Sequence, residues 1–119
     1  MSSANLAEIS AKDILRSDFV IHKMTLIFEV QDVTGRKIHL STERWKHISS
    51  EHPELANNLD EVKQTLIAPL ITVQNENDEF VNFYYRYNKT RADYLLVAVK
   101  YLNGKGFIIT SFRVKHIRK

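Results

Sequence analysis

One run of hydrophobic residues, Tyr94 to Val114, constrains the fold of this chain more than any other feature. The run holds two β-rich stretches joined by Asn103-Gly104, a dipeptide that accepts the positive φ angles of a tight turn. The pattern therefore predicts a β-hairpin, in which side chains alternate between the two faces of each strand.

The predicted hairpin has two unlike faces if a short, even-numbered loop joins its strands. One face is nearly all apolar and is expected to pack on helices: Leu95, Val97, Val99, Tyr101, Ile108, Thr110 and Phe112. The other face mixes polar and apolar side chains: Tyr94, Leu96, Ala98, Lys100, Phe107, Ile109, Ser111 and Arg113. This mixed face predicts a binding surface with Ser111 and Arg113 at its centre. Thr110 would join it only if a bulge or an odd-length loop reversed the alternation.

The chain before this hairpin changes between helical and strand-like periodicity. In chain order, the predicted elements are a helix at 6–16, strands at 23–32 and 36–40, helices at 43–51 and 58–68, and strands at 70–74 and 80–87. Helices that precede a run of antiparallel strands are typical of an α+β domain. We therefore expect N-terminal helices packed on one face of a four-stranded antiparallel sheet, preceded by a small β-hairpin.

Start and stop signals surround the two central helices. Ser41 offers a hydroxyl to the first free amide groups of the helix that follows it. That helix should end at His52, because the residue before Pro53 is pushed out of the α region. Asn58 stands three residues before Glu61, which is the spacing of a capping box at the start of the next helix.

The composition excludes several classes of protein. An apolar fraction of 44% and a charged fraction of 26% are those of an ordinary water-soluble domain. No apolar run approaches the ~20 residues that cross a bilayer, and the N-terminus has no secretory signal, so we expect a cytoplasmic protein that does not enter a membrane. The absence of cysteine excludes disulfides and thiolate metal sites.

The chain of 119 residues is long enough for a single domain with a normal core. We expect residues 1–20 to form an N-terminal helical extension, residues 24–114 to form the core and residues 115–119 to form a basic tail. The net charge of +3 favours anionic partners.

Two histidines lie near the predicted end of a helix. By their spacing, Arg44, His47 and Glu51 share one stripe of that helix. Each histidine either sits at a wet helix end without a function or acts as a general acid or base. His47 and His52 are about 140° apart around a helix and no third ligand lies nearby, so a metal site is not predicted.

The last strand before the hairpin combines aromatic and basic side chains. Phe83, Tyr85 and Tyr87 should lie on one face, whereas Tyr84 and Arg86 should lie on the other. The rings either fill a core or stack on unpaired bases, and Arg86 either reaches solvent or grips a phosphate. Neighbouring strands and loops can bring several cations to one phosphate: Arg86, Arg91, Lys100 and Arg113.

The sequence lacks a phosphate-binding glycine loop, a zinc motif, a nucleophile elbow and a pair of carboxylates suited to catalysis. The remaining chemistry is that of His, Arg, Lys, Tyr and hydroxyl side chains without a metal. These groups suit cleavage of RNA by its own 2′-hydroxyl, because the substrate supplies the nucleophile. The protein then needs a base, an acid, cations for the phosphorane and rings for stacking.

Several short segments, in this order, resemble the phage-associated branch of the barnase, EndoU, colicin and RelE-like (BECR) nuclease fold. The segments are Gly35-Arg36, Thr42 to Ile48, His52 to Leu55, Pro69, Tyr84 to Arg86 and Ile109 to Arg113. The resemblance makes residues 24–114 a nuclease-like core. It implies a metal-independent endoribonuclease without a cofactor, a toxin or effector whose products end in a 2′,3′-cyclic phosphate.

The resemblance implies roles for His47, His52, Arg86, Arg113 and Thr110 or Ser111, and the polar and aromatic patterns above add Arg44, Tyr85 and Lys100. The candidate catalytic residues are His47, His52, Arg86, Ser111 and Arg113. The candidate substrate-binding residues are Arg44, Tyr85, Lys100 and Thr110. RNA is the expected partner, together with a cognate antitoxin or immunity protein. The chain offers no carboxylate for the general base of a barnase-type mechanism, so the alternative is an inactive relative that binds RNA or a protein.

Overall fold

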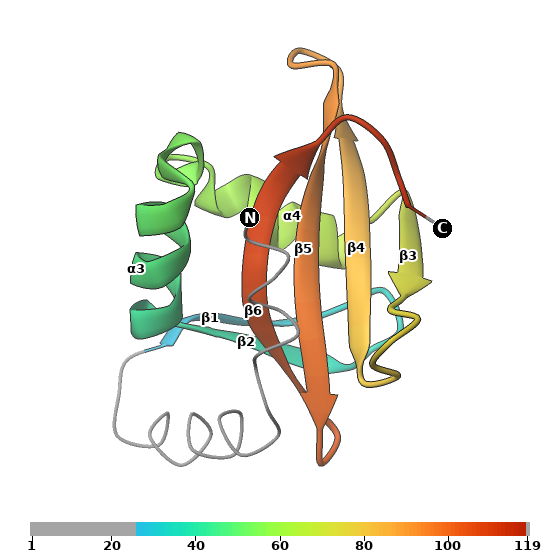
Figure 1. Cartoon of the computed structure of the whole chain (residues 1–119). Helices are drawn as coiled ribbons and strands as arrows, with labels where there is room; N and C mark the ends of the chain where they lie inside the picture. Colours follow the sequence, from blue (N-terminus) through green and yellow to red (C-terminus); the bar gives the residue numbers. More distant parts are fainter. Residues whose placement is uncertain (1–25, 119) are drawn as a thin grey trace.

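The computed structural model describes residues 26–118, which form one sheet with two α-helices and a 3-10 turn (Figure 1). The elements in chain order are β1 (Leu26–Gln31), β2 (Lys37–Ser41), α3 (Thr42–Glu51), the 3-10 turn (Pro53–Leu55), α4 (Leu59–Ile67), β3 (Ile71–Gln74), β4 (Val81–Asn88), β5 (Asp93–Leu102) and β6 (Lys105–Val114). The predicted helix at 6–16 and residue 119 lie outside the described residues.

The sheet has six strands in the order β1-β2-β6-β5-β4-β3. Neighbouring strands are antiparallel except β2 and β6, which run parallel and pair at Ile38–Gly106 and His39–Phe107. The predicted four-stranded antiparallel sheet with a separate hairpin is therefore wrong. The β1–β2 hairpin joins the sheet because β2 satisfies backbone groups on the edge of β6. Within residues 26–118 strands also come first, and both helices follow β2.

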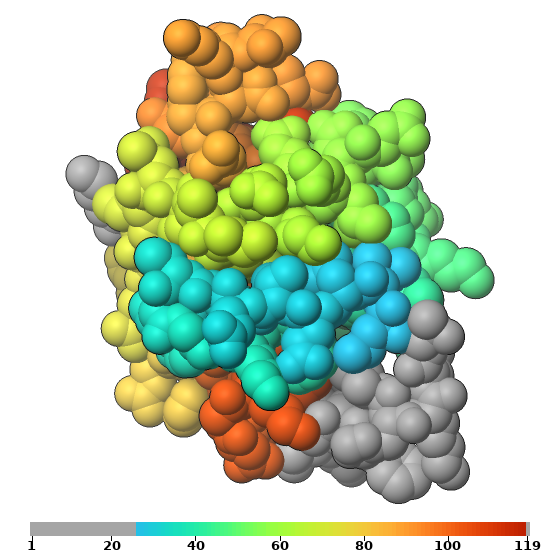
Figure 2. Space-filling model, turned by 180° about the vertical axis from the view of Figure 1, so that it is seen from behind, coloured from blue at the N-terminus to red at the C-terminus, as the bar shows by residue number. Residues whose placement is uncertain are grey.

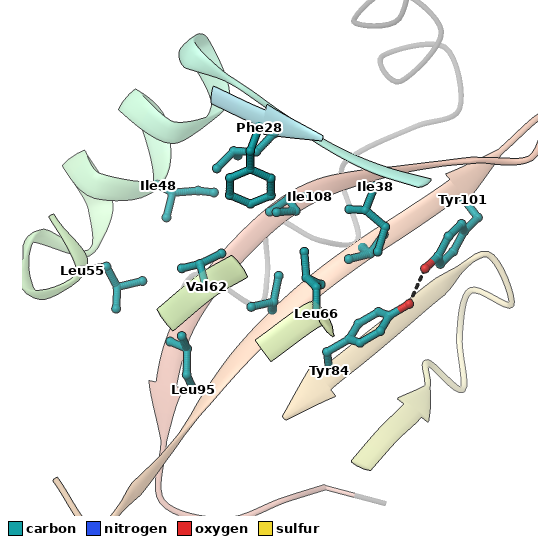
Figure 3. Packing of buried hydrophobic residues seen from close by; sticks show 13 residues of the cluster. Phe28, Ile38, Ile48, Leu55, Val62, Leu66, Tyr84, Leu95, Tyr101 and Ile108 are labelled. Carbon is teal, nitrogen blue, oxygen red and sulfur yellow. Dashed lines mark hydrogen bonds between the residues drawn. The ribbon is translucent and has the colours of Figure 1, made fainter. Parts of the chain in front are cut away.

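Both helices pack on one side of the sheet, which we call the helix face. α3 contacts β1, β2 and β6, whereas α4 contacts β1, β4 and β5. Figure 2 shows α4 beside the β1–β2 hairpin across this side of the molecule. The core between these layers (Figure 3) contains Phe28, Ile38, Leu40, Ile48, Leu55, Val62, Leu66, Tyr84, Leu95, Val97, Val99, Tyr101 and Ile108.

The ends of α3 agree with the sequence signals, and α4 begins after Asn58 as predicted, but without the predicted capping box. The Ser41 hydroxyl accepts a hydrogen bond from the Arg44 amide at 3.1 Å, and His52 is the C-cap of α3. The predicted capping box is not formed, because the Asn58 side chain accepts no hydrogen bond from a backbone amide of α4; its Nδ2 atom donates to Glu61 Oε1 at 3.3 Å instead. Acidic residues in that turn interact favourably with the helix dipole instead.

The predicted C-terminal hairpin is confirmed as β5 and β6. Its turn has positive φ angles at Asn103 (56°) and Gly104 (79°), as a type I′ turn requires. Each of its strands has 10 residues, and the pair lies in the middle of the sheet. The hairpin therefore forms the centre on which the other strands are added.

A β-bulge interrupts the register of this hairpin. Ala98 pairs with Thr110, but the next residue on β5, Val99, pairs with Ile108. Ile109 is therefore an extra residue on β6 with no counterpart on β5. Such an insertion shifts every later side chain of the bulged strand to the opposite face.

The bulge reverses the faces of the last part of β6. Ser111 pairs with Val97, so it and Arg113 lie on the helix face. Thr110 and Phe112 lie on the opposite side of the sheet. The predicted placement of Ser111 and Arg113 on the mixed face is therefore wrong, because regular alternation does not reveal where a bulge occurs.

The side of the sheet opposite the helices, which we call the second face, has a core of its own. Its buried members are Val81, Tyr85, Leu96, Ala98, Phe107 and Ile109. Partly buried side chains surround them: Ile71, Val73, Phe83, Tyr94, Leu102, Phe112, Val114 and Ile117. The alternation predicted for β4 is confirmed, with Tyr84 and Tyr85 in different cores. The mixed polar and apolar face expected for a binding surface is not confirmed, because this side of the sheet is largely apolar.

Replacing Gly106 with alanine is expected to lower the free energy of unfolding by about 1–3 kcal/mol, the usual cost of overpacking a core. A Cβ atom there would lie 2.8 Å from Tyr101 Cε1, 3.0 Å from Ile38 Cγ1 and 3.1 Å from Val99 Cγ1. Urea unfolding measures the loss, with the exposed Ser50→Ala change as control. Equal stability of the two variants would contradict this close packing where β2 meets β6.

Candidate functional site

The nine predicted site residues are divided between the two faces of the sheet and α3. On the helix face are Arg86, Ser111 and Arg113. On the second face are Tyr85, Lys100 and Thr110. On α3 or at its end are Arg44, His47 and His52. The structure therefore does not bring all nine to one surface.

Arg113 is held by carboxylates of the protein itself. Its Nη2 atom lies 2.5 Å from Glu61 Oε1, and its Nη1 atom lies 3.2 Å from Glu61 Oε2 and 3.1 Å from Asp93 Oδ1. The side chain is only 8% exposed. Burial alone would raise the pKa of Glu61, but hydrogen bonds from Arg113 and Asn88 and the charge of Arg113 lower it. This network ties α4 to β5 and β6.

Arg86 and Ser111 also make contacts within the fold. Arg86 Nη1 donates a hydrogen bond at 2.7 Å to the carbonyl of Ala68, the C-cap residue of α4. Such a cation satisfies a carbonyl that the helix itself leaves without a partner. The Ser111 hydroxyl is fully buried and donates to the Leu96 carbonyl at 2.8 Å. Both side chains therefore stabilise elements on the helix face.

Lys100 and Tyr85 lie in the second face. Lys100 Nζ is 3.0 Å from Asp78 Oδ2, and its side chain is 8% exposed. This contact joins β5 to the loop between β3 and β4. Tyr85 is buried, and its ring makes an edge-to-face contact with Tyr94, which makes a second one with Tyr87. Among these rings, Tyr87 is the one exposed to solvent.

The two histidines have different environments. His47 is exposed on α3, where its Nε2 atom lies 3.5 Å from Glu51 Oε2. His52 is mostly buried at the end of α3, with its ring stacked on Phe112 at a centroid distance of 5.5 Å and an interplanar angle of 25°. His52 Nδ1 lies 3.7 Å from Glu54 Oε2, and its buried Nε2 atom has no hydrogen-bond partner in the described structure.

Arg44 contacts the part of β6 that contains Thr110. Arg44 Nη1 donates a hydrogen bond at 3.5 Å to the carbonyl of Ile109, the bulged residue. Thr110 follows Ile109 directly, and Phe112 lies two residues farther on the same face. We call the group formed by His52, Phe112, Thr110 and Arg44 the His52 site.

The His52 site exists because β2 pairs with β6 only at the beginning of β6. Beyond that point α3 lies beside β6, as Figure 1 shows, and the bulge presents the Ile109 carbonyl to Arg44. Proline after His52 ends the helix there and holds the imidazole at the edge of the sheet. The site therefore combines a proton carrier, a carboxylate beside it, a cation and an aromatic ring.

A second polar cluster was not predicted from the sequence. The Tyr84 hydroxyl donates to Asp32 Oδ2 at 2.5 Å and is also hydrogen-bonded to the Tyr101 hydroxyl (Figure 3). Asp32 Oδ1 accepts hydrogen bonds from the backbone amides of Thr34 and Arg36, each at 2.9 Å. We call these residues the Asp32 cluster. An aspartate two residues before a turn threonine was the available signal for such a turn.

The Asp32 cluster stabilises the fold rather than offering a reactive group. Burial and the hydrogen bond to Asp32 raise the pKa of Tyr84, and burial raises the pKa of Tyr101 to about 12. Burial would raise the pKa of Asp32, but hydrogen bonds from Tyr84 and Thr34 lower it. Both phenols therefore stay protonated near neutral pH and fasten the β1–β2 turn to β4 and β5.

Replacing Tyr84 with phenylalanine is expected to cost about 1.5–3 kcal/mol of unfolding free energy, since it removes a buried hydrogen bond to a carboxylate. Thermal or urea unfolding would measure the loss. Tyr87→Phe is the matched control, because Tyr87 lies on the same strand and is 47% exposed. A Tyr84→Phe variant as stable as that control would show that the hydroxyl contributes nothing.

Comparisons with known proteins add no assignment. No protein-family model, curated protein or solved structure matches the chain. Within residues 26–118, no group of three or more His, Asp or Glu side chains is arranged to hold a metal ion. Neither of the described α-helices has the length and apolar character needed to span a membrane.

Proposed function

We propose that the protein is a metal-independent endoribonuclease of the toxin or effector kind and that the His52 site carries its chemistry. The observation that supports this most directly is the environment of the His52 ring. The imidazole stacks on Phe112 and lies 3.7 Å from Glu54 Oε2, and its buried Nε2 atom has no partner within residues 26–118. An oriented imidazole beside a carboxylate is the arrangement expected of a proton-transfer group.

The proposed reaction is attack of the RNA 2′-oxygen on the adjacent phosphorus. The bond from phosphorus to the 5′ oxygen breaks, which leaves a 2′,3′-cyclic phosphate and a 5′-hydroxyl. His52 takes the proton of the 2′-hydroxyl, and the leaving oxygen takes a proton from water. Arg44 contributes positive charge near the phosphate, and Thr110 contributes a hydroxyl on the same stretch of β6.

The geometry narrows the set of residues that the sequence predicted. His52 stacks on Phe112 and Arg44 donates to the Ile109 carbonyl, so both side chains lie along the stretch of β6 that contains Thr110. Arg86 and Arg113 bind acceptors within the fold, so the proposal does not give either of them a phosphate. Glu54 supplies a carboxylate that the resemblance left unassigned.

A non-catalytic RNA-binding protein is the second candidate. It is favoured by the engagement of Arg113, Arg86 and Ser111 in structural contacts, which leaves few groups to stabilise a phosphorane. The rings of Tyr85, Tyr94 and Tyr87 contact one another in series, and the exposed ring of Tyr87 is suited to stacking on a base.

RNA cleavage in the presence of EDTA distinguishes these two functions. A ribonuclease of the proposed type should cut structured RNA and leave 2′,3′-cyclic phosphate ends, which phosphatase treatment followed by mass spectrometry identifies. Salt-sensitive binding without cleavage would support the second candidate instead. The absence of both cleavage and binding would contradict both proposals.

A further inference from the structure

The sheet is open along the outer side of β3, and we call the backbone groups on that side the β3 edge. β3 is the last strand in the order of the sheet, so nothing within residues 26–118 pairs with its outer side. The Asn75 amide donates to the Val81 carbonyl at 2.9 Å on the inner side. Because an antiparallel ladder alternates, Thr72 and Gln74 direct their amide and carbonyl groups outward, and both residues are exposed. Such groups are ready to pair with another strand.

The opposite edge of the sheet, along β1, is protected from such pairing. A register shift between Leu26 and Phe28 interrupts β1. Glu29 places a charge in the middle of the strand, and α3 and α4 both contact β1. Natural sheets use bulges, charges and covering helices to block an edge. β3, with the sequence Ile-Thr-Val-Gln, has no charged residue and no register shift, so the β3 edge is the one open to a partner.

Basic side chains gather at the end of the β3 edge where β3 begins. Arg86 Nη1 donates a hydrogen bond at 2.7 Å to the carbonyl of Ala68, which stands just before β3. Lys89 is exposed directly after the end of β4. The C-terminal tail, which contains Lys115 and Arg118, leaves β6 and runs toward the start of β3 (Figure 1). This end of the β3 edge is therefore positively charged.

Acidic side chains gather at the other end, in the loop that follows β3. Glu76 and Glu79 are exposed there. Asp78 is paired with Lys100, so the net charge of the loop comes from the two glutamates. The β3 edge thus has opposite charges at its two ends. That pattern makes it complementary to a second copy of itself that is turned end over end about a two-fold axis.

We propose that two copies of the chain pair through the β3 edge, antiparallel and about a two-fold axis at Thr72, so that their sheets become continuous. In this arrangement Thr72 lies beside its own counterpart, and Ile71 of one copy lies beside Val73 of the other. The acidic loop of each copy then faces the basic end of the other.

Opposite charges and apolar contact hold this pair together. Residues 68 and 76 are equally far from Thr72 along the chain, so the axis brings Glu76 of one copy level with Ala68 of the other. Arg86 binds the Ala68 carbonyl, and its cation therefore comes within reach of that glutamate. Leu70, which is 61% exposed in the single chain, lies beside the end of the second copy's β3 and loses contact with water.

The interface is small, since β3 has only four residues. We therefore expect a weak dimer that forms at high protein concentration and weakens as salt screens the charges. This inference does not rest on the ribonuclease proposal, because none of its contacts involves the His52 site.

Sedimentation equilibrium of the full chain tests the proposal directly. The average mass should rise from that of a monomer toward that of a dimer between about 10 µM and about 1 mM protein. Thr72→Lys sets two like charges opposite each other at the axis and should raise the dissociation constant at least about tenfold. Ser50→Lys is the matched control, because it adds the same charge at an exposed position on α3. It should leave the dissociation constant unchanged.

An exchange of charges tests the two-fold arrangement. One double variant, Glu76→Lys with Glu79→Lys, makes the acidic end basic, and the other, Lys89→Glu with Arg118→Glu, reverses two charges at the basic end. Each variant alone should bind itself at least about tenfold more weakly than wild type, because like charges then meet across the axis. An equimolar mixture should recover most of the lost affinity, since acidic ends again meet basic ends. Circular dichroism shows that each variant is folded.

Three results would overturn the proposal. A chain that remains monomeric up to about 1 mM would leave the β3 edge to a strand from another protein. A dimer that survives Thr72→Lys would be formed through a different surface. A mixture of the two charge variants that associates no better than either variant alone would show that the acidic end of one copy does not meet the basic end of the other.

Discussion

Replacement of Arg113 by methionine is expected to lower the free energy of unfolding by about 3–5 kcal/mol, which is the cost of removing one partner from a buried ion pair. Methionine keeps much of the side-chain volume but leaves Glu61 and Asp93 partly buried without their cation. The residue that the sequence placed at the centre of a binding surface would thus be one of the main determinants of stability. Urea unfolding at neutral pH measures the effect.

The pH dependence of the Arg113 effect provides an internal check. The pKa of Glu61 in the folded protein is below its ordinary value of 4.5. Its contribution to stability is therefore present above pH 4.5 and is lost as the pH falls through the lower, folded-state pKa. The difference between wild type and Arg113→Met should shrink over that acidic range.

Arg118→Met is the matched control for this experiment, because Arg118 is an exposed arginine a few residues farther along the chain. It should change stability by less than about 0.5 kcal/mol. A loss of under about 1 kcal/mol in Arg113→Met would indicate a loosely held arginine. That outcome would return Arg113 to the set of candidate phosphate ligands.

Replacement of His52 by alanine is expected to reduce the rate of RNA cleavage by about 10²–10⁴-fold, the usual contribution of a general acid or base. The reason is the geometry of the His52 site, where the imidazole stacks on Phe112 and lies 3.7 Å from Glu54 Oε2. The measurement is the initial rate on a structured RNA in EDTA.

His47→Ala is the matched control, since His47 lies on the same helix but its side chain is 55% exposed. It should cleave RNA within about twofold of the wild-type rate, because a solvent-facing side chain on α3 does not approach β6. Loss of cleavage in His47→Ala with retention in His52→Ala would exchange the roles of the two histidines. Unfolding curves of both variants separate lost chemistry from lost structure.

The part of the fold that was predictable from the sequence is the part set by neighbouring residues. Asn103-Gly104 permits few turns other than a tight hairpin, and Ser41 caps α3 as its hydroxyl predicts. Alternation along β4 likewise separates Tyr84 from Tyr85. In each case the determining interaction spans only a few residues, so the local pattern contains it.

The candidate site was predictable only in part, for the same physical reason. A histidine before a proline at a helix end indicated His52 as a candidate. Its contact with Phe112 depends on the bulge at Ile109, because without that extra residue Phe112 would point toward the helices. The Asp32 cluster likewise joins a turn to two distant strands, which no short segment of sequence reveals.

By itself, the sequence determined the class of the domain, its central hairpin and the residue types available for chemistry. Tertiary structure decided which of these residues share a surface. The parallel pairing of β2 with β6 and the bulge in β6 both depend on strands that are not determined by one short segment of sequence. The bulge also changes the face of every side chain after it in β6. That shift of one residue placed Arg113 beside Glu61 in the fold and left His52, Phe112 and Thr110 together at the edge of β6.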